Sequence, residues 1–210
     1  KNSIFEPDEL IKESLLLQLL EQPENSEMFH EEYAFFSSTS EGMKKHFKKF
    51  SDDIFNSKYF NNDDNFVVEL GCNDGILIDN FAKKNIRHLG IEPSLNVADV
   101  ARGKGINVIS KFFEKKLASE IISKYGKANI FMAANVMCHI PSLNDVIEGI
   151  KLLLKPNGVI IFEDPYLGDV ITKKSYDQFY DEHVFIFSAL AIQKLFEKFN
   201  LELINLEPQL

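Results

Sequence analysis

The chain has 210 residues, of which 45% are hydrophobic and 26% charged, and its formal net charge is −9. This length and composition are typical of one globular domain with a core and room for a small helical appendage. The acidic balance argues against nucleic acid as a partner, because a basic surface for phosphates is missing. Without an apolar run of the roughly 20 residues that span a bilayer, and without a signal-peptide pattern, we expect no membrane partner and a cytoplasmic location.

The first 60 residues are predicted to be mainly helical. Residues 8–21 have leucines at helical spacing and a charged opposite face, which indicates an amphipathic helix. The aromatic and hydroxyl-rich segment 29–42 (FHEEYAFFSSTSEG) is typical of a chain wrapped over another part of a protein. Residues 40–55 return to a helical period, with Ser40 as a suitable N-cap. The lysine-rich run within that helix, 44–49, is interpreted as a solvated face rather than a phosphate-binding patch.

Strand-like and helical segments alternate after residues 61–65 (NNDDN). The predicted strands are 65–71, 88–93, 106–110, 128–135 and 158–165, with a further strand-like run at 201–208. The predicted helices are 76–84, 95–105, 142–155 and 188–200, and residues 155–158 (KPNG) are expected to form a turn. Such alternation predicts an α/β fold, a Rossmann-like doubly wound and mostly parallel sheet with helices on both faces.

Ligands of such sheets bind outside the carboxyl ends of the strands. In this sequence the strand ends are richer in polar or aromatic residues than the strands that precede them. These strand-end segments are 69–75, 92–96, 110–113, 135–139 and 163–166. We therefore expect the binding site to be built from these five segments.

The loop after the first strand of the sheet distinguishes between two nucleotide-like ligands. A dinucleotide loop requires G-x-G-x-x-G to bring a helix N-terminus to a pyrophosphate, whereas here Gly71 and Gly75 are four apart and Ile76 follows. The acidic Asp74 would repel a pyrophosphate but suits a ligand with an amino group and a sulfonium. The pattern E-x-G-x-x-x-G, which begins at Glu69, resembles that of class I S-adenosylmethionine (SAM)-dependent methyltransferases. The expected cofactor is therefore SAM rather than NAD.

Two further strand ends contribute to the predicted cofactor site. Glu92 follows Gly71 by 21 residues and is placed to accept hydrogen bonds from the ribose hydroxyls, although NAD-binding folds have an acid there too. Asn135 is a candidate for the methionine part of SAM, with a turn or helix-cap role as the alternative. The predicted cofactor-binding residues are Ser37, Glu69, Gly71, Asn73, Asp74, Gly75, Glu92, Pro93 and Asn135.

A narrower resemblance rests on segments 31–40, 89–106, 135–167 and 175–188 (SYDQFYDEHVFIFS). Together they resemble the nucleotide-sugar C-methyltransferase family over most of the chain, and the Glu-His-x-x-x-Phe-Ser portion is the most specific. Members methylate a ring carbon next to the ketone of a deoxy keto-sugar on a nucleoside diphosphate. They typically begin with a cysteine-rich zinc-binding domain and end with a further domain, neither of which is recognisable here. We expect either a fragment of such a protein or a shorter relative with another acceptor.

The resemblance implies five catalytic positions, and their chemistry agrees with it. Carbon methylation beside a ketone needs a base for the α-proton, and His183 suits this because an unperturbed imidazole titrates near pH 6.5. Tyr33 and His139 are candidate donors to an enolate oxygen. Glu182 or Tyr180 is expected to orient the base or bind the acceptor. Residues 1–60 would form a helical lid segment and residues 61–210 the SAM-binding domain.

Other interpretations of the same residues stay open. His183 and Tyr33 both have aromatic neighbours and could be packing residues. Cys72 and Cys138 are not part of a CxxC pair and are interpreted as buried thiols, so no metal ligands are predicted. The alternatives to C-methylation are O- or N-methylation of another small molecule, or a SAM-binding module without catalysis. The sequence does not indicate the oligomeric state.

Overall fold

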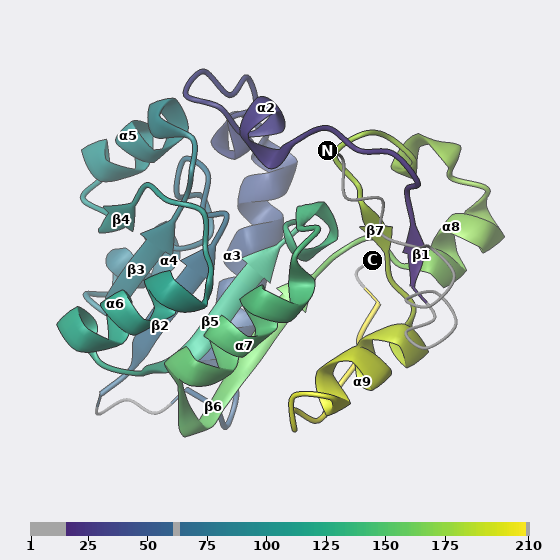
Figure 1. The fold of residues 1–210 in the computed structure, drawn as a ribbon. Coiled ribbons are helices and arrows are strands. Elements are labelled where there is room, and N and C mark those ends of the chain that lie inside the picture. The colour runs from purple at the N-terminus through teal and green to yellow at the C-terminus, as the bar shows by residue number, and fades with distance from the viewer. Residues whose placement is uncertain (1–15, 61–63, 209–210) are drawn as a thin grey trace.

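The computed structural model of the chain describes residues 16–60 and 64–208, and its centre is a five-stranded parallel sheet (Figure 1). The strands lie in the order β4-β3-β2-β5-β6. They are β2 (Phe66–Leu70), β3 (Arg87–Ile91), β4 (Val108–Ile109), β5 (Ala128–Ala134) and β6 (Leu154–Glu163). A smaller antiparallel pair joins β1 (Leu17–Gln18) to β7 (Phe185–Ile186). The predicted Rossmann-like α/β fold is confirmed.

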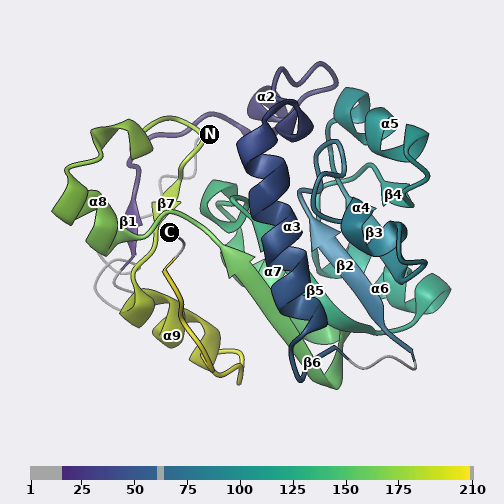
Figure 2. The ribbon, with the colours of Figure 1, turned by 180° about the vertical axis from the view of Figure 1, so that it is seen from behind.

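Helices cover both faces of the parallel sheet, as the two opposite views show (Figures 1 and 2). The helices α6 (Lys115–Tyr125) and α7 (Leu143–Leu153) pack on one face, and α3 (Glu41–Phe55) and α4 (Asp79–Ala82) pack on the other. The remaining helices are α2 (Asn25–Met28), α5 (Leu95–Gly103), α8 (Leu167–Lys173) and α9 (Ala189–Glu197). Short 3-10 turns occupy Ser37–Thr39, Met137–His139 and Tyr176–Gln178. Among the described residues, no helix is long and apolar enough to cross a membrane.

The buried strand β2 shows why the sheet needs both helical layers. Phe66, Val68 and Leu70 belong to the apolar cluster that contains α6 and α7, whereas Val67 packs with α3. Successive side chains of a strand point to opposite faces, so a continuously apolar strand must be covered twice. A strand that is apolar on both faces is best buried at the centre of the sheet, which is the position of β2.

The strand order reverses between β2 and β5, which are neighbours in the sheet. At such a switch point the connections leave in opposite directions, so a crevice opens beyond the carboxyl ends of the two strands. All five predicted strand-end segments begin at or next to the last residue of a strand. They therefore lie along the same edge of the sheet, as expected.

Two N-terminal expectations have different outcomes. Ser40 is the N-cap of α3, since its Oγ accepts the backbone N–H of Met43 at 3.3 Å. The predicted helix 8–21 is wrong where it is described, because β1 replaces it, and residues 8–15 lie outside the described part. In a helix Leu16 and Leu20 would share a face, yet they are 4% and 82% exposed. Pairing with β7 satisfies this segment's backbone instead.

In the second half of the chain two expectations are corrected and one helix is added. The segment 155–158 is an irregularity within β6 rather than a separate turn, because the register passes from Ala128↔Leu154 to Ile130↔Val159. The helix α6 was not predicted, although Leu117 and Ile121 are buried at helical spacing. Residues 201–208, which were expected to be strand-like, pair with neither of the two described sheets.

Candidate active site

The loop after β2 turns through two glycines. Gly71 and Gly75 have φ angles of +66° and +86°, a region that glycine enters without steric cost. A Cβ on Gly71 would lie 2.3 Å from Cγ2 of Val136, and one on Gly75 would lie 2.3 Å from Cδ1 of Ile106. Backbone conformation and close packing therefore both require glycine at these two positions.

A cavity of about 1120 Å³ opens at the carboxyl edge of the sheet, beside the switch point. Single-ligand pockets are typically about 300–1,000 Å³, so there is room for a cofactor and a second molecule. The predicted residues that line it are Tyr33, Ser37, Glu69, Gly71, Asn73, Glu92, Pro93, Asn135, His139, Tyr180 and Glu182. The other three predicted residues, Asp74, Gly75 and His183, do not line it.

Two carboxylates mark the cofactor side of the cavity. Glu92 accepts the backbone N–H groups of Asn73 and Ser94, each at 2.9 Å, which holds its carboxylate against the glycine loop. Glu69 is 3% exposed, and its Oε2 has no hydrogen-bond partner among the described residues. Burial raises the pKa of both carboxyls. Buried acceptors beside an open cavity suit a ligand that brings hydroxyl or ammonium donors.

The polar side chains of the glycine loop hold the N-terminal segment. Asn73 accepts the N–H of Ser37 at 3.0 Å and donates to the carbonyl of Phe35 at 2.9 Å. Asp74 accepts both the backbone N–H and the hydroxyl of Ser38. Asp74 is thus placed to anchor this segment rather than to face the cavity, where it was expected to meet the cofactor.

The same segment is fastened to the start of α5. Asn96 donates to the carbonyl of Tyr33 at 2.7 Å and accepts the Tyr33 N–H at 3.2 Å. The backbone N–H of Asn96 donates to the carbonyl of Glu31 at 3.3 Å. Residues 31–39, which we call the lid segment, therefore lie over the loops after β2 and β3, as the aromatic and hydroxyl pattern predicted.

Two histidines lie next to each other, and one of them, His139, lines the cavity. His139 and His183 have ring centroids 5.0 Å apart. The Nδ1 of His139 lies 2.6 Å from the carbonyl oxygen of Glu182, and the Nδ1 of His183 lies 2.9 Å from that of Gln178. A carbonyl can only accept, so Nδ1 carries the proton in both rings and each Nε2 keeps its lone pair. Burial lowers the pKa of His183, and that of His139 to about 4.

Two tyrosines and a glutamate complete the cluster. The hydroxyl of Tyr180 lies 2.8 Å from Nε2 of His183, which can only accept in this tautomer, so Tyr180 donates. The hydroxyl of Tyr33 donates to Oε2 of Glu182 at a long 3.4 Å. Burial raises the pKa of Tyr180 to about 12 and raises that of Tyr33 as well, so both hydroxyls are donors at neutral pH. The structure therefore brings all five predicted catalytic residues together.

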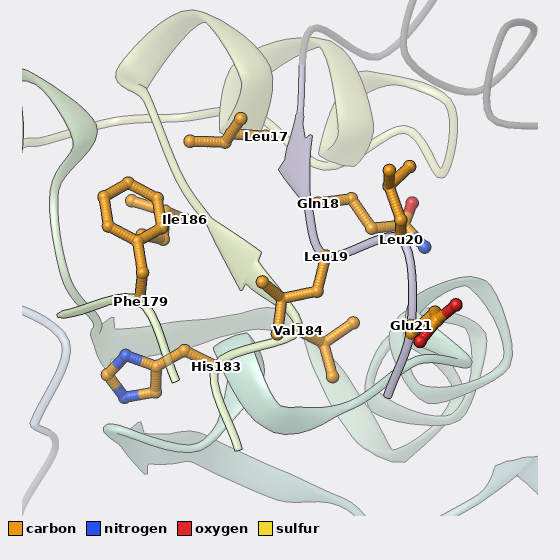
Figure 3. Close-up of a pocket in the computed structure, with 9 residues that line it drawn as sticks. All are labelled: Leu17, Gln18, Leu19, Leu20, Glu21, Phe179, His183, Val184 and Ile186. Atoms are coloured by element: carbon orange, nitrogen blue, oxygen red, sulfur yellow. The ribbon is translucent and has the colours of Figure 1, made fainter. Parts of the chain in front are cut away.

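His183 lines a second, smaller cavity of about 500 Å³ (Figure 3). This residue is 3% exposed and does not line the larger cavity, whereas Tyr180 does. The other residues around the smaller cavity are Leu17, Gln18, Leu19, Leu20, Glu21, Phe179, Val184 and Ile186. Tyr180 thus stands between His183 and the space in which an acceptor would bind.

Sequence reasoning missed a polar pair on the cavity wall. Nε2 of His46, on α3, lies 2.8 Å from Oε1 of Glu163, at the end of β6. Glu163 belongs to a predicted strand end, but nothing in the sequence pairs it with His46, 117 residues away. The neighbouring lysines do form the expected solvated face, since Lys48 and Lys49 pair with acids one turn later.

The profile of a methyltransferase-domain family matches residues 40–206. The chain belongs to this family. It is a class I methyltransferase domain whose cofactor is SAM, which confirms the choice of SAM over NAD. The match includes every element of the parallel sheet and all the predicted catalytic residues except Tyr33.

Named methyltransferases are similar to this domain in sequence. The C-methyltransferase NovU of Streptomyces niveus is 28% identical over 173 residues, which is 82% of this chain and 41% of that protein. A ubiquinone biosynthesis O-methyltransferase of Actinobacillus pleuropneumoniae is 28% identical over 46% of this chain and 44% of its own length. The chain thus spans less than half the length of these relatives.

Solved structures confirm the fold of the domain. A SAM-dependent methyltransferase from Archaeoglobus fulgidus superposes with a TM-score of 0.59 at 16% identity, covering 75% of this chain and 67% of that one. An O-methyltransferase family protein from Burkholderia thailandensis gives 0.59 at 14% identity, covering 76% and 52%.

The residues present fit SAM. The unpartnered Oε2 of Glu69 and the carboxylate of Glu92 border the cavity and offer acceptors to ammonium and hydroxyl groups. At Gly71 the backbone approaches so closely to Val136 that a side chain would be excluded. The cavity wall therefore offers carboxylate acceptors at Glu69 and Glu92 and accessible backbone at Gly71. These groups suit SAM, which is a cationic nucleoside without a phosphate.

Proposed function

We propose that this domain methylates a carbon next to the ketone of a nucleotide-linked deoxy keto-sugar. The observation that carries the proposal is a cavity lined by the glycine loop and by Tyr33, His139, Tyr180 and Glu182, with His183 hydrogen-bonded behind Tyr180. Similarity to a C-methyltransferase over 82% of the chain supports carbon as the methylated atom.

The cofactor would be held by Glu69, Gly71, Asn73 and Glu92, all of which line the cavity. When bound, SAM supplies a methyl group on a sulfonium, which is open to attack by a carbon nucleophile. The protein must therefore generate that nucleophile and align it, and alignment contributes much of the rate in such reactions. The lid segment, which brings Tyr33 and Ser37 to the cavity, excludes water from this space.

Tyr180 and His183 would remove the α-proton as a pair. Nε2 of His183 accepts the Tyr180 hydroxyl, and only Tyr180 faces the cavity. The carbon-bound proton passes to the Tyr180 oxygen while the Tyr180 proton passes to Nε2, which leaves an imidazolium and an enolate. The carbonyl of Gln178 holds Nδ1 and so keeps Nε2 available as the final acceptor.

The enolate oxygen needs a hydrogen-bond donor, for which Tyr33 and His139 are the two candidates. The tautomer of His139 distinguishes between them. His139 has its proton on Nδ1 and donates it to the carbonyl of Glu182, so its Nε2 offers only a lone pair. Tyr33 has a long, 3.4 Å bond to Glu182 that is easily exchanged for a stronger one. We assign donation to Tyr33 and orientation of Glu182 to His139.

Exchange of the α-proton tests the mechanism separately from methyl transfer. In D₂O without SAM, the wild type should exchange the α-proton of a nucleotide-linked keto-deoxysugar, followed by NMR. We expect His183→Gln to lower this rate at least about 100-fold, because a general base contributes about 10²–10⁴. Affinity for S-adenosylhomocysteine should be unchanged, since His183 does not line the cofactor cavity.

A matched control is available in His88, which lies on β3 and contacts the carbonyl of Ile86. His88→Gln should exchange the α-proton like the wild type. Equal exchange by His183→Gln would show that His183 only packs, and the mechanism would be wrong. Methyl transfer to a hydroxyl without any α-proton exchange would instead favour the O-methyltransferase alternative, to which the ubiquinone relatives point.

A further inference from the structure

Three buried side chains with nitrogen or sulfur ligand atoms converge behind the candidate active site. A ring nitrogen of His139, a ring nitrogen of His183 and Sγ of Cys138 all lie within 4.8 Å of one another. Cys138 and His139 belong to the 3-10 turn after β5, and His183 precedes β7. Their exposed fractions are 0%, 7% and 3%. Thiolate and imidazole are the ligands that Zn²⁺ prefers.

The hydrogen bonds of the two histidines are those of metal ligands. A histidine that binds a metal almost always donates its other ring N–H to a carboxylate or a backbone carbonyl, which orients the ring. His139 and His183 each donate Nδ1–H to a carbonyl, those of Glu182 and Gln178. In both rings Nδ1 is therefore occupied by a backbone carbonyl, which leaves Nε2 as the nitrogen that can bind a metal.

The present partners of the two Nε2 atoms are neutral and replaceable. Nε2 of His139 lies 3.5 Å from Nδ2 of Asn135, which is at the limit of a hydrogen bond. Nε2 of His183 accepts the hydroxyl of Tyr180, which is 42% exposed and free to turn to solvent. A metal ion would thus displace two neutral donors at the rings, and at Cys138 it would replace the hydrogen bond between the thiol and Asp164.

We propose that Cys138, His139 and His183 form a binding site for a thiophilic divalent cation, Zn²⁺ in particular. Tetrahedral zinc separates its sulfur and nitrogen ligands by about 3.3–3.7 Å, so the three groups need to close by about 1 Å. His139 lines the large cavity, which leaves a fourth position for water. On binding, bonds form from the metal to Sγ and to one nitrogen of each ring, and the thiol proton leaves to the buffer.

Occupation of this site would stop the proposed reaction. The metal takes the lone pair of His183 that would otherwise receive the proton from Tyr180. This consequence rests on the proposed function, whereas binding itself does not. The sequence did not predict this metal site, because His183 lies 44 residues after His139 and neither belongs to a metal-ligand spacing motif.

Cobalt spectroscopy tests the site without any acceptor. The purified chain, in reducing buffer without chelator, is titrated with Co²⁺ and then with Zn²⁺. We expect a saturable near-ultraviolet thiolate-to-cobalt band and intense visible bands of a tetrahedral ion, both removed by Zn²⁺. Cys138→Ser should lose the thiolate band and bind about 100-fold more weakly, since even outer-shell changes cost 10–100-fold.

The other cysteine is the matched control. Cys72 is also buried and free, but it lies in the glycine loop, so Cys72→Ser should keep the thiolate band. His139→Asn should keep the thiolate but lose the tetrahedral spectrum, with about 100-fold weaker binding. Binding of S-adenosylhomocysteine by each variant shows that it is folded. No saturable band in the wild type, or a band kept by Cys138→Ser and lost by Cys72→Ser, would overturn the proposal.

Discussion

The buried carboxylate of Glu69 shows how one residue connects ligand binding with a cost in stability. Its burial next to Glu92 and Asp74 raises its pKa, and its Oε2 has no hydrogen-bond partner within the described structure. A charge in such surroundings is unfavourable until a cation or donor reaches it. The ammonium group of SAM would supply one, so the empty domain should be less stable than the loaded one.

Replacement of Glu69 by Gln should reveal this cost. Because the folded state raises the pKa above its ordinary 4.5, it binds the proton more tightly than the unfolded state does. The wild type therefore loses stability from this carboxyl as the pH rises from about 4.5 through the raised pKa, and Glu69→Gln lacks that part of the loss. Thermal unfolding without ligand should show the variant more stable at pH 8 and equal to the wild type near pH 4.

The same variant should bind SAM about tenfold more weakly, because a charged hydrogen bond is worth about 1.5–3 kcal/mol. Calorimetric titration measures this. Lower stability at pH 8, or unchanged SAM affinity, would contradict the assignment of Glu69 to the cofactor.

Gly71 is a second residue for which a single substitution tests the predicted role, that of a glycine required by the backbone and by close packing. Gly71→Ala places a Cβ 2.3 Å from Val136 and keeps an alanine at φ +66°. We expect a loss of about 1–3 kcal/mol of stability in urea unfolding, together with weaker SAM binding. Gly103→Ala is the control, because an added Cβ at that helical position has nothing within 4 Å and should stabilise by up to about 1 kcal/mol.

At the scale of elements, the lid segment stands out because polar contacts hold it while none of its side chains belongs to a buried apolar cluster. Ser37, Ser38 and Tyr33 are held by Asn73, Asp74 and Asn96. Such a segment opens at a lower free energy than the sheet, since few buried apolar contacts hold it. Opening would admit ligands, and closing would bring Tyr33 to the candidate active site.

Asn96→Ala should loosen the lid segment selectively. It removes both hydrogen bonds to the Tyr33 backbone, each worth about 1 kcal/mol. Hydrogen exchange of residues 31–39 should become faster while that of β2 and β5 stays the same, and the affinity for SAM should fall about tenfold. Asn80→Ala, which removes bonds only to carbonyls in its own turn, is the control. Unchanged exchange in Asn96→Ala would mean that other contacts hold the segment.

For the whole molecule, the cavity at the switch point links cofactor binding to global unfolding. Its walls come from β2, β5, β6, the loop after β3 and the lid segment, so SAM can bind only the folded state. S-adenosylhomocysteine at 100 times its Kd should raise the free energy of unfolding by about 2.7 kcal/mol, seen as a higher Tm. NAD at the same concentration should leave Tm unchanged. A shift with NAD alone would contradict the choice of cofactor.

Local patterns were sufficient for most of the parallel sheet and for the ligand class. The apolar strands β2, β3 and β5, the cap at Ser40 and the spacing of Gly71 and Gly75 all act within a few residues, where steric and hydrogen-bonding preferences are strong. The predicted catalytic residues depended on a family resemblance, because no local rule relates Tyr33 to His183.

Features that depend on distant partners could not be predicted from those patterns. The leucine spacing at 16–20 predicted a helix, but these residues instead include a short strand that pairs with β7. Asp74 had the chemistry of a cofactor ligand, yet its carboxylate accepts hydrogen bonds from Ser38 instead. His183 had the chemistry of a base, but its Nε2 accepts the hydroxyl of Tyr180, and of the two residues only Tyr180 lines the large cavity. In each case the nearest residue in space, rather than in the chain, determines which hydrogen bond forms. The sequence by itself therefore determined the fold class and the type of ligand, because both depend on patterns within a few residues. Only the tertiary structure determined the position of each side chain at the site, because that depends on packing between distant segments.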